Sequence, residues 1–256
     1  MQTSTSDIER PMLRLGSVAF IAGIVIAVVS TAIHPTSNDL MNNPVVFTMY
    51  TKDDLWIASH IGQFAGILLI FAGGFVALHR LLIIARPEES GSSTTSVSSA
   101  TLSWFGLVTA ILSASAFTIL QAVDGIALKI AANTWYAIPL EEQERKAITF
   151  RVAEGIRWTE WAIQAYYRML TGAVALISGV AIAKSKSILS RWIGWLGVIA
   201  GIVALAAGVV VAYVGFSSVR DPVTNLSTYT LYPWIVILGI FMWRKTIVVK
   251  KKREHQ

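Results

Sequence analysis

The sequence predicts an all-α, polytopic membrane helix bundle with about six transmembrane helices. Of its 256 residues, 54% are apolar and only 14% are charged, and the mean hydropathy is +0.60. Soluble domains carry about 25% charged residues. The deficit here is concentrated in long apolar segments, and about 20 such residues in a helix span a hydrocarbon layer of ~30 Å. We therefore expect a multi-pass protein of the cell membrane whose main surroundings are the lipid bilayer.

Six apolar segments reach the length of a membrane span. Between an amino-terminal segment (1–14) and a basic tail (250–256), they run over residues 15–34, 55–79, 102–124, 158–184, 192–215 and 229–249. The stretch 88–103 is rich in Ser, Thr and Gly, which predicts a flexible linker. Ser30-Thr31-Ala32 loosely resembles a signal-peptidase site, although about 19 apolar residues exceed the 7–15 of a signal sequence. Cleavage of the first span is left open.

The distribution of Lys and Arg predicts the orientation. With an even number of spans, both termini share one side, and that side holds thirteen Lys and Arg residues against seven on the other. Positive residues favour the cytoplasmic side, so both termini are predicted to be cytoplasmic. The run Lys250–Arg253 directly follows an apolar helix, where it suits the anionic leaflet. The net charge of +6 is therefore not read as nucleic-acid binding.

The first two helical hairpins are predicted to be a parallel repeat, related by an axis along the membrane normal. Chance alignment of glycine-rich apolar helices is the alternative. The aligned pairs are Gly16 with Gly106 and His34 with Asp124 at an offset of 90 residues, and Trp56 with Trp161 and Gly74 with Gly179 at an offset of 105.

Ionisable residues gather at the membrane face opposite the termini. On the fourth span, Gln164 and Arg168 share one stripe with Arg157. Arg168 lies about 15 Å of helix beyond Trp158, near the middle of the bilayer. A guanidinium there costs on the order of 2.5–3.5 kcal/mol, so it should face a partner inside the bundle. The predicted partners are Asp124, Gln121 and Glu160. The predicted functional cluster is His60, Asp124, Glu160, Gln164 and Arg168, and a purely structural arginine–carboxylate pair is the alternative.

Four of the polar residues are of types that bind metal ions. His34, His60, Asp124 and Glu154 would suit zinc or iron in a mixed histidine and carboxylate site. No spacing fixes two of them on one helical turn, so the site would require convergence of separate helices. A b-type haem between His34 and His60 is a second possibility. Without a metal, each histidine would be an interfacial residue bonded to a backbone carbonyl.

Several short motifs resemble those of other proteins. Ala32-Ile33-His34-Pro35, Leu55-Trp56-x-x-x-His60 and Val123-Asp124-Gly125 together resemble uncharacterised prokaryotic six-helix integral membrane proteins, known only as domains of unknown function. The resemblance covers most of the chain and implies no activity. It implies that His34, His60 and Asp124 recur as a set.

Three functions follow from these observations. The leading prediction is an accessory or assembly subunit of a membrane complex, with other membrane subunits as partners and the polar cluster as a structural feature. The alternative is a carrier of a small solute or ion that uses Arg168 and Asp124. The third is a membrane-embedded metal- or haem-dependent enzyme using His60, Asp124 and Glu160. It ranks last because the chain has no catalytic motif.

Overall fold

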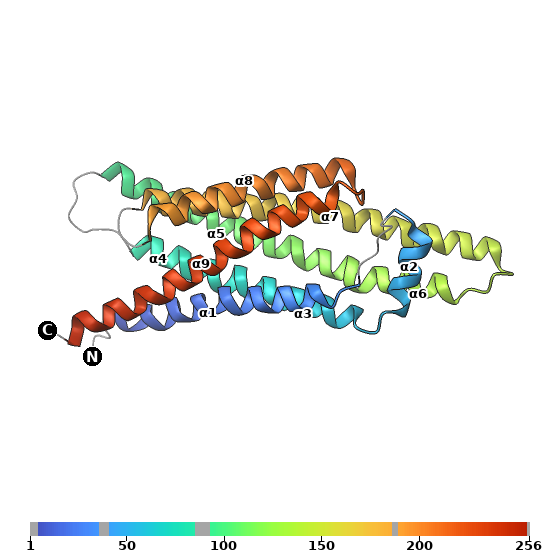
Figure 1. Cartoon of the computed structure of the whole chain (residues 1–256), viewed down its shortest axis with the longest axis horizontal. Coiled ribbons are helices and arrows are strands. Elements are labelled where there is room, and N and C mark those ends of the chain that lie inside the picture. Colours follow the sequence, from blue (N-terminus) through green and yellow to red (C-terminus); the bar gives the residue numbers. More distant parts are fainter. Residues whose placement is uncertain (1–4, 36–40, 85–92, 186–188, 255–256) are drawn as a thin grey trace.

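The computed structural model describes residues 5–35, 41–84, 93–185 and 189–254, and within these ranges it contains helices and no strands. The predicted all-α bundle is confirmed. α3, η1 and α4 form one continuous helix, and α5, η2 and α6 form another (Figure 1). The elements are α1 (Thr5–Ala32), α2 (Asn43–Lys52), α3 (Trp56–Leu68), η1 (Leu69–Phe75), α4 (Val76–Ile84), α5 (Ser93–Gln121), η2 (Ala122–Leu128), α6 (Lys129–Ala137), α7 (Gln143–Lys184), α8 (Arg191–Val214) and α9 (Arg220–Glu254).

Within the described ranges, six helices are long and apolar enough to cross a membrane, as expected of a multi-pass integral membrane protein. They are Pro11–Ala32, Trp56–Ile83, Ser99–Ala137, Gln143–Lys184, Arg191–Val214 and Arg220–Lys245. The start of α1 and the end of α9 lie at the same end of the bundle (Figure 1). An even number of spans requires this arrangement. That this end is cytoplasmic stays a prediction.

Two of the helices are much longer than their predicted spans. α7 has 42 residues, or ~63 Å of helix, about twice the thickness of the hydrocarbon layer. The helix formed by α5, η2 and α6 likewise continues past the predicted end at residue 124, to Ala137. The predicted boundaries therefore mark a change in polarity and not the ends of the helices. The end of α6 and the start of α7 project furthest at the end of the bundle opposite the termini (Figure 1).

The predicted linker 88–103 falls partly on residues 85–92, which lie outside the described ranges. From Ser93 onward the structure differs from the prediction, because these residues belong to α5. The Ser99 hydroxyl donates to the carbonyl of Ala181 on α7 at 3.1 Å. Ser103 lies 2.8 Å from Nδ1 of His79 on α4. Small polar side chains join neighbouring membrane helices in this way, so their abundance here reflects packing.

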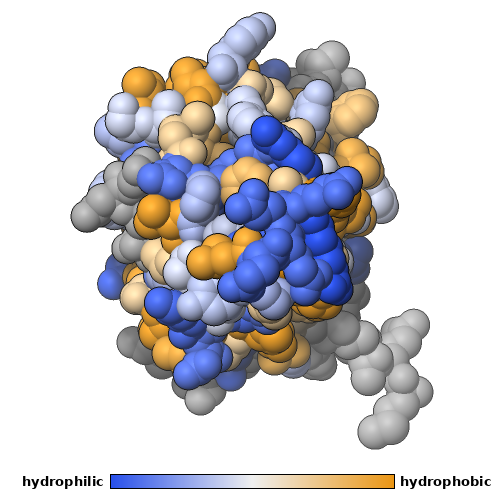
Figure 2. Space-filling model, turned by 90° about the vertical axis from the view of Figure 1, so that its right-hand side faces the viewer, coloured by the Kyte–Doolittle hydropathy of each residue, from blue (hydrophilic) through white to orange (hydrophobic). Residues whose placement is uncertain are grey.

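A cap covers the end of the bundle opposite the termini. It consists of α2, α6 and the first part of α7 (Gln143–Arg157), and Figure 1 shows α2 lying across the ends of the longer helices. The Lys129 ammonium donates to the carbonyls of Thr51 and Asp53 at 3.1 and 2.9 Å, which satisfies the carboxyl end of α2. Viewed from this end, the molecule is largely hydrophilic (Figure 2). The cap has its own apolar core of Val46, Phe47, Tyr50, Trp56, Leu128, Ala132 and Ala153.

The two predicted repeat hairpins make corresponding contacts. In the first hairpin, Gly23 packs against the carbonyl of Gly66, so that α1 and α3 are in backbone contact. In the second hairpin, Ser113 lies 90 positions after Gly23, and Thr171 lies 105 positions after Gly66. Their hydroxyl oxygens are 2.9 Å apart, between α5 and α7. With the same offsets, the contact between Gly16 and Gly73 in the first hairpin corresponds to the contact between Gly106 and Ser178 in the second. The correspondence does not extend to the π-helices, because η1 lies in the second helix of its hairpin and η2 in the first of the next.

Candidate functional site: a polar cavity and a histidine–aspartate cluster

A cavity of about 910 Å³ lies between α1, α7 and α9, with further walls from α3, α5 and η2. It arises because α9 crosses the bundle diagonally (Figure 1). Near the termini, α9 meets α1, where the Ser17 hydroxyl donates to the carbonyl of Gly239 at 2.5 Å. Toward the cap, α9 is instead tied to α7, through Arg220 and Gln164. α1 and α9 therefore diverge toward the cap, and the cavity occupies the space between them.

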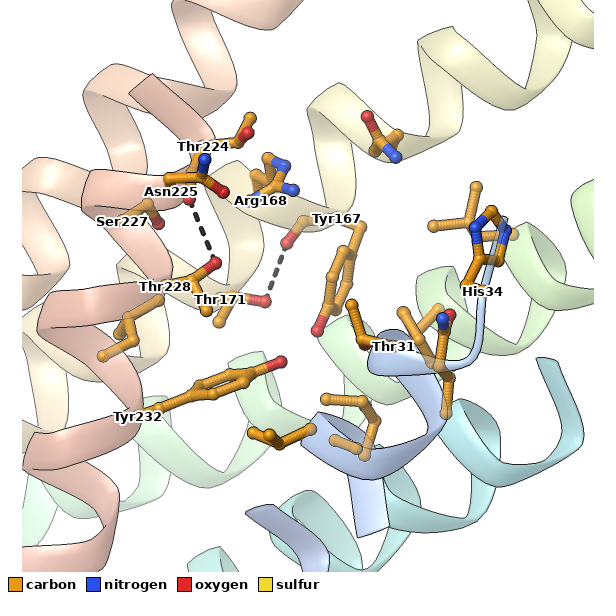
Figure 3. A pocket seen from close by; sticks show the side chains of 18 of the residues that line it. Thr31, His34, Tyr167, Arg168, Thr171, Thr224, Asn225, Ser227, Thr228 and Tyr232 are labelled. Carbon is orange, nitrogen blue, oxygen red and sulfur yellow. Dashed lines mark hydrogen bonds between the residues drawn. The ribbon is translucent and has the colours of Figure 1, made fainter. Parts of the chain in front are cut away.

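The lining of the cavity is amphipathic. Tyr167 and Tyr232 point into it from α7 and α9 (Figure 3). Several hydroxyl groups of the lining donate hydrogen bonds to backbone carbonyls of their own helix. One example is Thr228, which donates to the carbonyl of Thr224 at 3.0 Å. The apolar walls come mainly from α1, α3 and α5, with Ile24, Ala27, Val28, Ile67, Phe117 and Leu120. A molecule with both a polar and an apolar part matches this lining.

Arg168 lines the cavity from α7, and Figure 3 shows it beside α9. Its Nε atom is buried and makes no hydrogen bond to any described residue. The predicted pairing of Arg168 with Asp124, Gln121 or Glu160 is not formed in the described part of the chain. Gln121 contacts Gln63 instead, at 3.4 Å. Arg168 is therefore a cationic group on the cavity wall whose Nε–H is not bonded to any described residue.

Gln164 is engaged by an arginine that the sequence analysis did not place in the site. Its Oε1 atom accepts hydrogen bonds from Nε and Nη2 of Arg220, at 3.2 and 3.0 Å. Arg220 also pairs with Asp221 at 3.0 Å, and its guanidinium lies over the ring of Phe216. Arg220 was missed because the sixth span was expected to begin at residue 229. Asp221-Pro222 is a typical signal of a helix start and would have extended that helix.

Glu160 is a buried carboxylate on the cavity wall. Its side chain is 4% exposed, and its Oε2 atom has no hydrogen-bond partner among the described residues. It lies in the electrostatic field of Asp124, Arg157 and Arg220. Arg157 itself bonds to Asn43 of the cap and lies 4.2 Å from the centre of the Phe216 ring. Glu160 thus adds an acidic group to a cavity that also contains Arg168.

His60 and Asp124 meet at the wall of the cavity beneath the cap. Nε2 of His60 lies 3.1 Å from a carboxylate oxygen of Asp124. Asp124 belongs to the π-helix η2, a distortion that is common at functional sites. The next residue, Gly125, allows α3 to approach, because a Cβ atom there would lie 2.8 Å from that of His60. The indole of Trp56 fixes this approach by donating to the Gly125 carbonyl at 2.9 Å.

His34 completes the cluster. One ligand atom each from His34, His60 and Asp124 lies within 4.8 Å of the others. Burial lowers the pKa of the His34 imidazole below its ordinary value of 6.5, and the charge of Asp124 partly offsets this effect. We call these three residues the His–Asp cluster.

The fourth predicted metal ligand lies elsewhere. Glu154 accepts a hydrogen bond from the Asn43 amide at 2.9 Å and pairs with Arg151 at 2.6 Å, so it contributes to the cap. The predicted haem also conflicts with the geometry. The ring centres of His34 and His60 are 4.9 Å apart, and rings in direct contact leave no layer for a porphyrin between them. Of the five residues predicted as a functional cluster, Asp124, Glu160, Gln164 and Arg168 line the cavity, and His60 reaches it through Asp124.

Comparison with known proteins adds no assignment. A scan against protein-family models, a search of curated proteins and a search of solved structures each returned no match. The resemblance to prokaryotic membrane proteins therefore stays a prediction, and the function is argued from the geometry of the cavity.

Proposed function

We propose that this integral membrane protein binds, and carries across the membrane, a small organic anion with an apolar portion. The observation that carries the proposal is Arg168, whose Nε atom is buried without a partner on the wall of a cavity of about 910 Å³. A cationic group within a membrane protein typically marks the path of a substrate or ion. The size of the cavity lies in the range of sites for small molecules.

The distribution of polar groups defines the class of ligand. An acidic head group would accept hydrogen bonds from Arg168, and the hydroxyls of Tyr167 and Tyr232 supply further polar contacts. Apolar atoms of the ligand would lie against Ile24, Phe117 and neighbouring side chains of α1 and α5. Arg220 is less available, because Gln164 and Asp221 already bond to it. Arg168 is therefore the residue expected to select for negative charge.

The predicted role of accessory subunit stays a prediction. Large apolar side chains such as Leu15 and Phe105 are exposed along the spans, at 70% and 61%. Contact with lipid accounts for such exposure without a partner subunit. The cavity is the more specific feature, and for that reason the binding function is preferred.

The experiment uses the full chain in lipid nanodiscs and octanesulfonate as a permanently anionic amphiphile. We expect saturable binding by calorimetry, and no comparable binding of octyltrimethylammonium, the cation with the same chain. Arg168→Gln should weaken octanesulfonate binding about 10- to 100-fold, since a hydrogen bond to a charged group contributes about 1.5–3 kcal/mol. Arg151→Gln is the matched control, because Arg151 lies on the same helix but is 77% exposed in the cap.

Uptake of octanesulfonate into proteoliposomes tests transport itself. The wild-type protein and Arg151→Gln should mediate uptake that Arg168→Gln abolishes. Equal binding of the anion and the cation, or unchanged affinity and flux in Arg168→Gln, would refute the proposal.

A further inference from the structure

The His–Asp cluster has a chemistry of its own, distinct from that of Arg168. His34 follows the end of α1, His60 lies on α3 and Asp124 lies on η2, so three separate parts of the chain bring their ligand atoms within 4.8 Å of one another. His60 is 3% exposed and Asp124 has a side-chain exposure of 15%. Three such groups rarely converge under burial unless an interaction compensates for their desolvation.

The hydrogen bonds of the two histidines fix which ring nitrogen carries the proton. Nδ1 of His60 lies 2.7 Å from the carbonyl oxygen of Trp56. Nδ1 of His34 lies 2.8 Å from the carbonyl oxygen of Pro35. A carbonyl oxygen only accepts hydrogen bonds, so Nδ1 must be the donor in both rings. In the neutral form, Nε2 of each ring therefore presents a lone pair.

The contact between His60 and Asp124 follows a pattern that calls for a cation. The two closest atoms are 3.1 Å apart, yet Nε2 of His60 has no hydrogen-bond partner among the described residues. The close approach is thus not aligned as a hydrogen bond from an Nε2 proton would be. A lone pair and a carboxylate oxygen at this distance repel each other unless a positive charge, a metal ion or a second proton on the imidazole, is shared between them. His34 brings a second imidazole to the same point, its ring centre 4.9 Å from that of His60.

We propose that Nε2 of His34, Nε2 of His60 and the carboxylate of Asp124 bind a divalent transition-metal ion, zinc or ferrous iron. Two such ligands, each about 2.0–2.2 Å from a tetrahedral metal ion, lie about 3.3–3.5 Å apart. The observed 3.1 Å between His60 and Asp124 is close to this value. Two histidines and one carboxylate are a ligand set of zinc and of non-haem iron sites.

The surroundings hold the ligands as metal sites generally require. Histidine ligands usually donate their other ring N–H to a carbonyl or carboxylate, and here the carbonyls of Pro35 and Trp56 receive these bonds. The indole of Trp56 lies against both imidazoles, at 4.9 Å from His34 and 4.4 Å from His60. Trp56 also binds η2, which carries Asp124, so one side chain orients all three ligands.

The proposed metal would be accessible from the cavity. His34 and Asp124 both line it, as does Glu160, whose Oε2 atom has no described partner. Three protein ligands leave at least one coordination position open, the feature that distinguishes reactive metal sites from purely structural ones. The metal site goes beyond the proposed carrier function and does not depend on it.

The test measures zinc bound to the full chain in nanodiscs, after treatment with a chelator and re-equilibration with zinc sulfate. We expect one zinc ion per chain by elemental mass spectrometry. His34→Gln and Asp124→Asn should each lower the affinity at least tenfold. His79→Gln is the matched control, because His79 lies on the same span as His60 but contacts Ser103 at 2.8 Å. Cobalt should give the visible absorption of a tetrahedral nitrogen and oxygen site in the wild type and in His79→Gln, and not in His34→Gln or Asp124→Asn.

Folding and function are separated by two further measurements. His34 is only partly buried at the edge of the cluster, so His34→Gln should unfold at the wild-type temperature in the absence of metal. Arg168→Gln should keep its zinc, which distinguishes failure of the carrier proposal from failure of the metal site. Substoichiometric zinc in the wild type, or equal affinity in the wild type, His34→Gln and Asp124→Asn, would overturn the assignment. His60 and Asp124 would then be a buried structural pair.

Discussion

Helix α7 has two faces that pack in opposite ways. Toward α8 it is in close backbone contact, whereas toward α1 and α9 it borders a cavity of about 910 Å³. Both regions lie in the same bundle and share one helix. The difference therefore arises from the side chains and not from the position in the membrane.

The interface between α7 and α8 is a ladder of small residues. The ladder repeats every seven residues, which keeps one stripe of each helix against its neighbour. Small residues let helix backbones approach closely in a membrane, where van der Waals packing replaces the hydrophobic effect between helices. The pairs in contact are Ala165 with Gly208, Gly172 with Gly201 and Gly179 with Gly194.

Along the same part of α7, between the ladder residues Ala165 and Gly172 and just before them, the cavity face carries Gln164, Tyr167 and Arg168. None of these side chains is small, and α9 opposite them carries Tyr232 and several hydroxyl residues. The helices remain apart where such residues meet. Small side chains on one face of α7 thus allow close packing, and large polar side chains on the other face keep the cavity open.

The largest expected loss of stability comes from adding a methyl group to the small-residue ladder between α7 and α8. In Gly172→Ala, the new Cβ would lie 2.5 Å from the backbone nitrogen of Leu205, so the helices must separate. Overpacking of this kind costs about 1–3 kcal/mol or more. We expect a clearly lower unfolding temperature and less monodisperse protein. Gly155→Ala is the control on the same helix, because nothing lies within 4 Å of its new Cβ. A methyl there should be neutral or stabilising by up to ~1 kcal/mol. Equal stability of the two variants would contradict the ladder.

An intermediate effect is expected on the cavity side. In Gly125→Ala, a Cβ would lie 2.8 Å from Cβ of His60 and 2.9 Å from its Cγ, which displaces the imidazole from Asp124. Changes to groups that orient metal ligands typically weaken metal binding by about 10- to 100-fold. Zinc titration should show a loss in this range, while Gly155→Ala keeps the wild-type affinity. If zinc affinity is the same in Gly125→Ala, Gly125 does not position His60.

The smallest effect is expected in the cap, which belongs neither to the α7–α8 interface nor to the cavity. Asn43 donates to Glu154 at 2.9 Å and accepts from Arg157, so it fastens α2 to α7. Asn43→Ala should lower the stability of the cap by about 0.5–1.5 kcal/mol, because it removes the hydrogen bonds of Asn43 to Glu154 and Arg157. Hydrogen exchange should accelerate in α2 and remain unchanged in α8. Unaltered protection of α2 would show that its apolar core alone holds the cap.

Much of the site was predictable residue by residue, but its pairings were not. The helical spacing correctly placed Gln164 and Arg168 on one face of α7, and the offset of 90 residues related His34 to Asp124. The partner expected for Arg168 was wrong, because Asp124 contacts His60 and Gln121 contacts Gln63. Glu154 was expected beside the metal ligands, yet α7 begins at Gln143, well before the predicted span, and carries Glu154 into the cap. The cap itself was not predicted, since α2 has only ten residues, too few for a span, and the first part of α7 is rich in charged residues.

The sequence by itself determined the helical class and the six spans. These depend on hydropathy and on the period of a helix, which are local properties of the chain. Only the tertiary structure decided where α9 crosses, and therefore that a cavity exists and that Arg220 reaches Gln164, 56 residues earlier in the chain. It also decided that His34, His60 and Asp124 meet. Such contacts depend on crossing angles and on the π-helix η2, which arise from the packing of all the helices together.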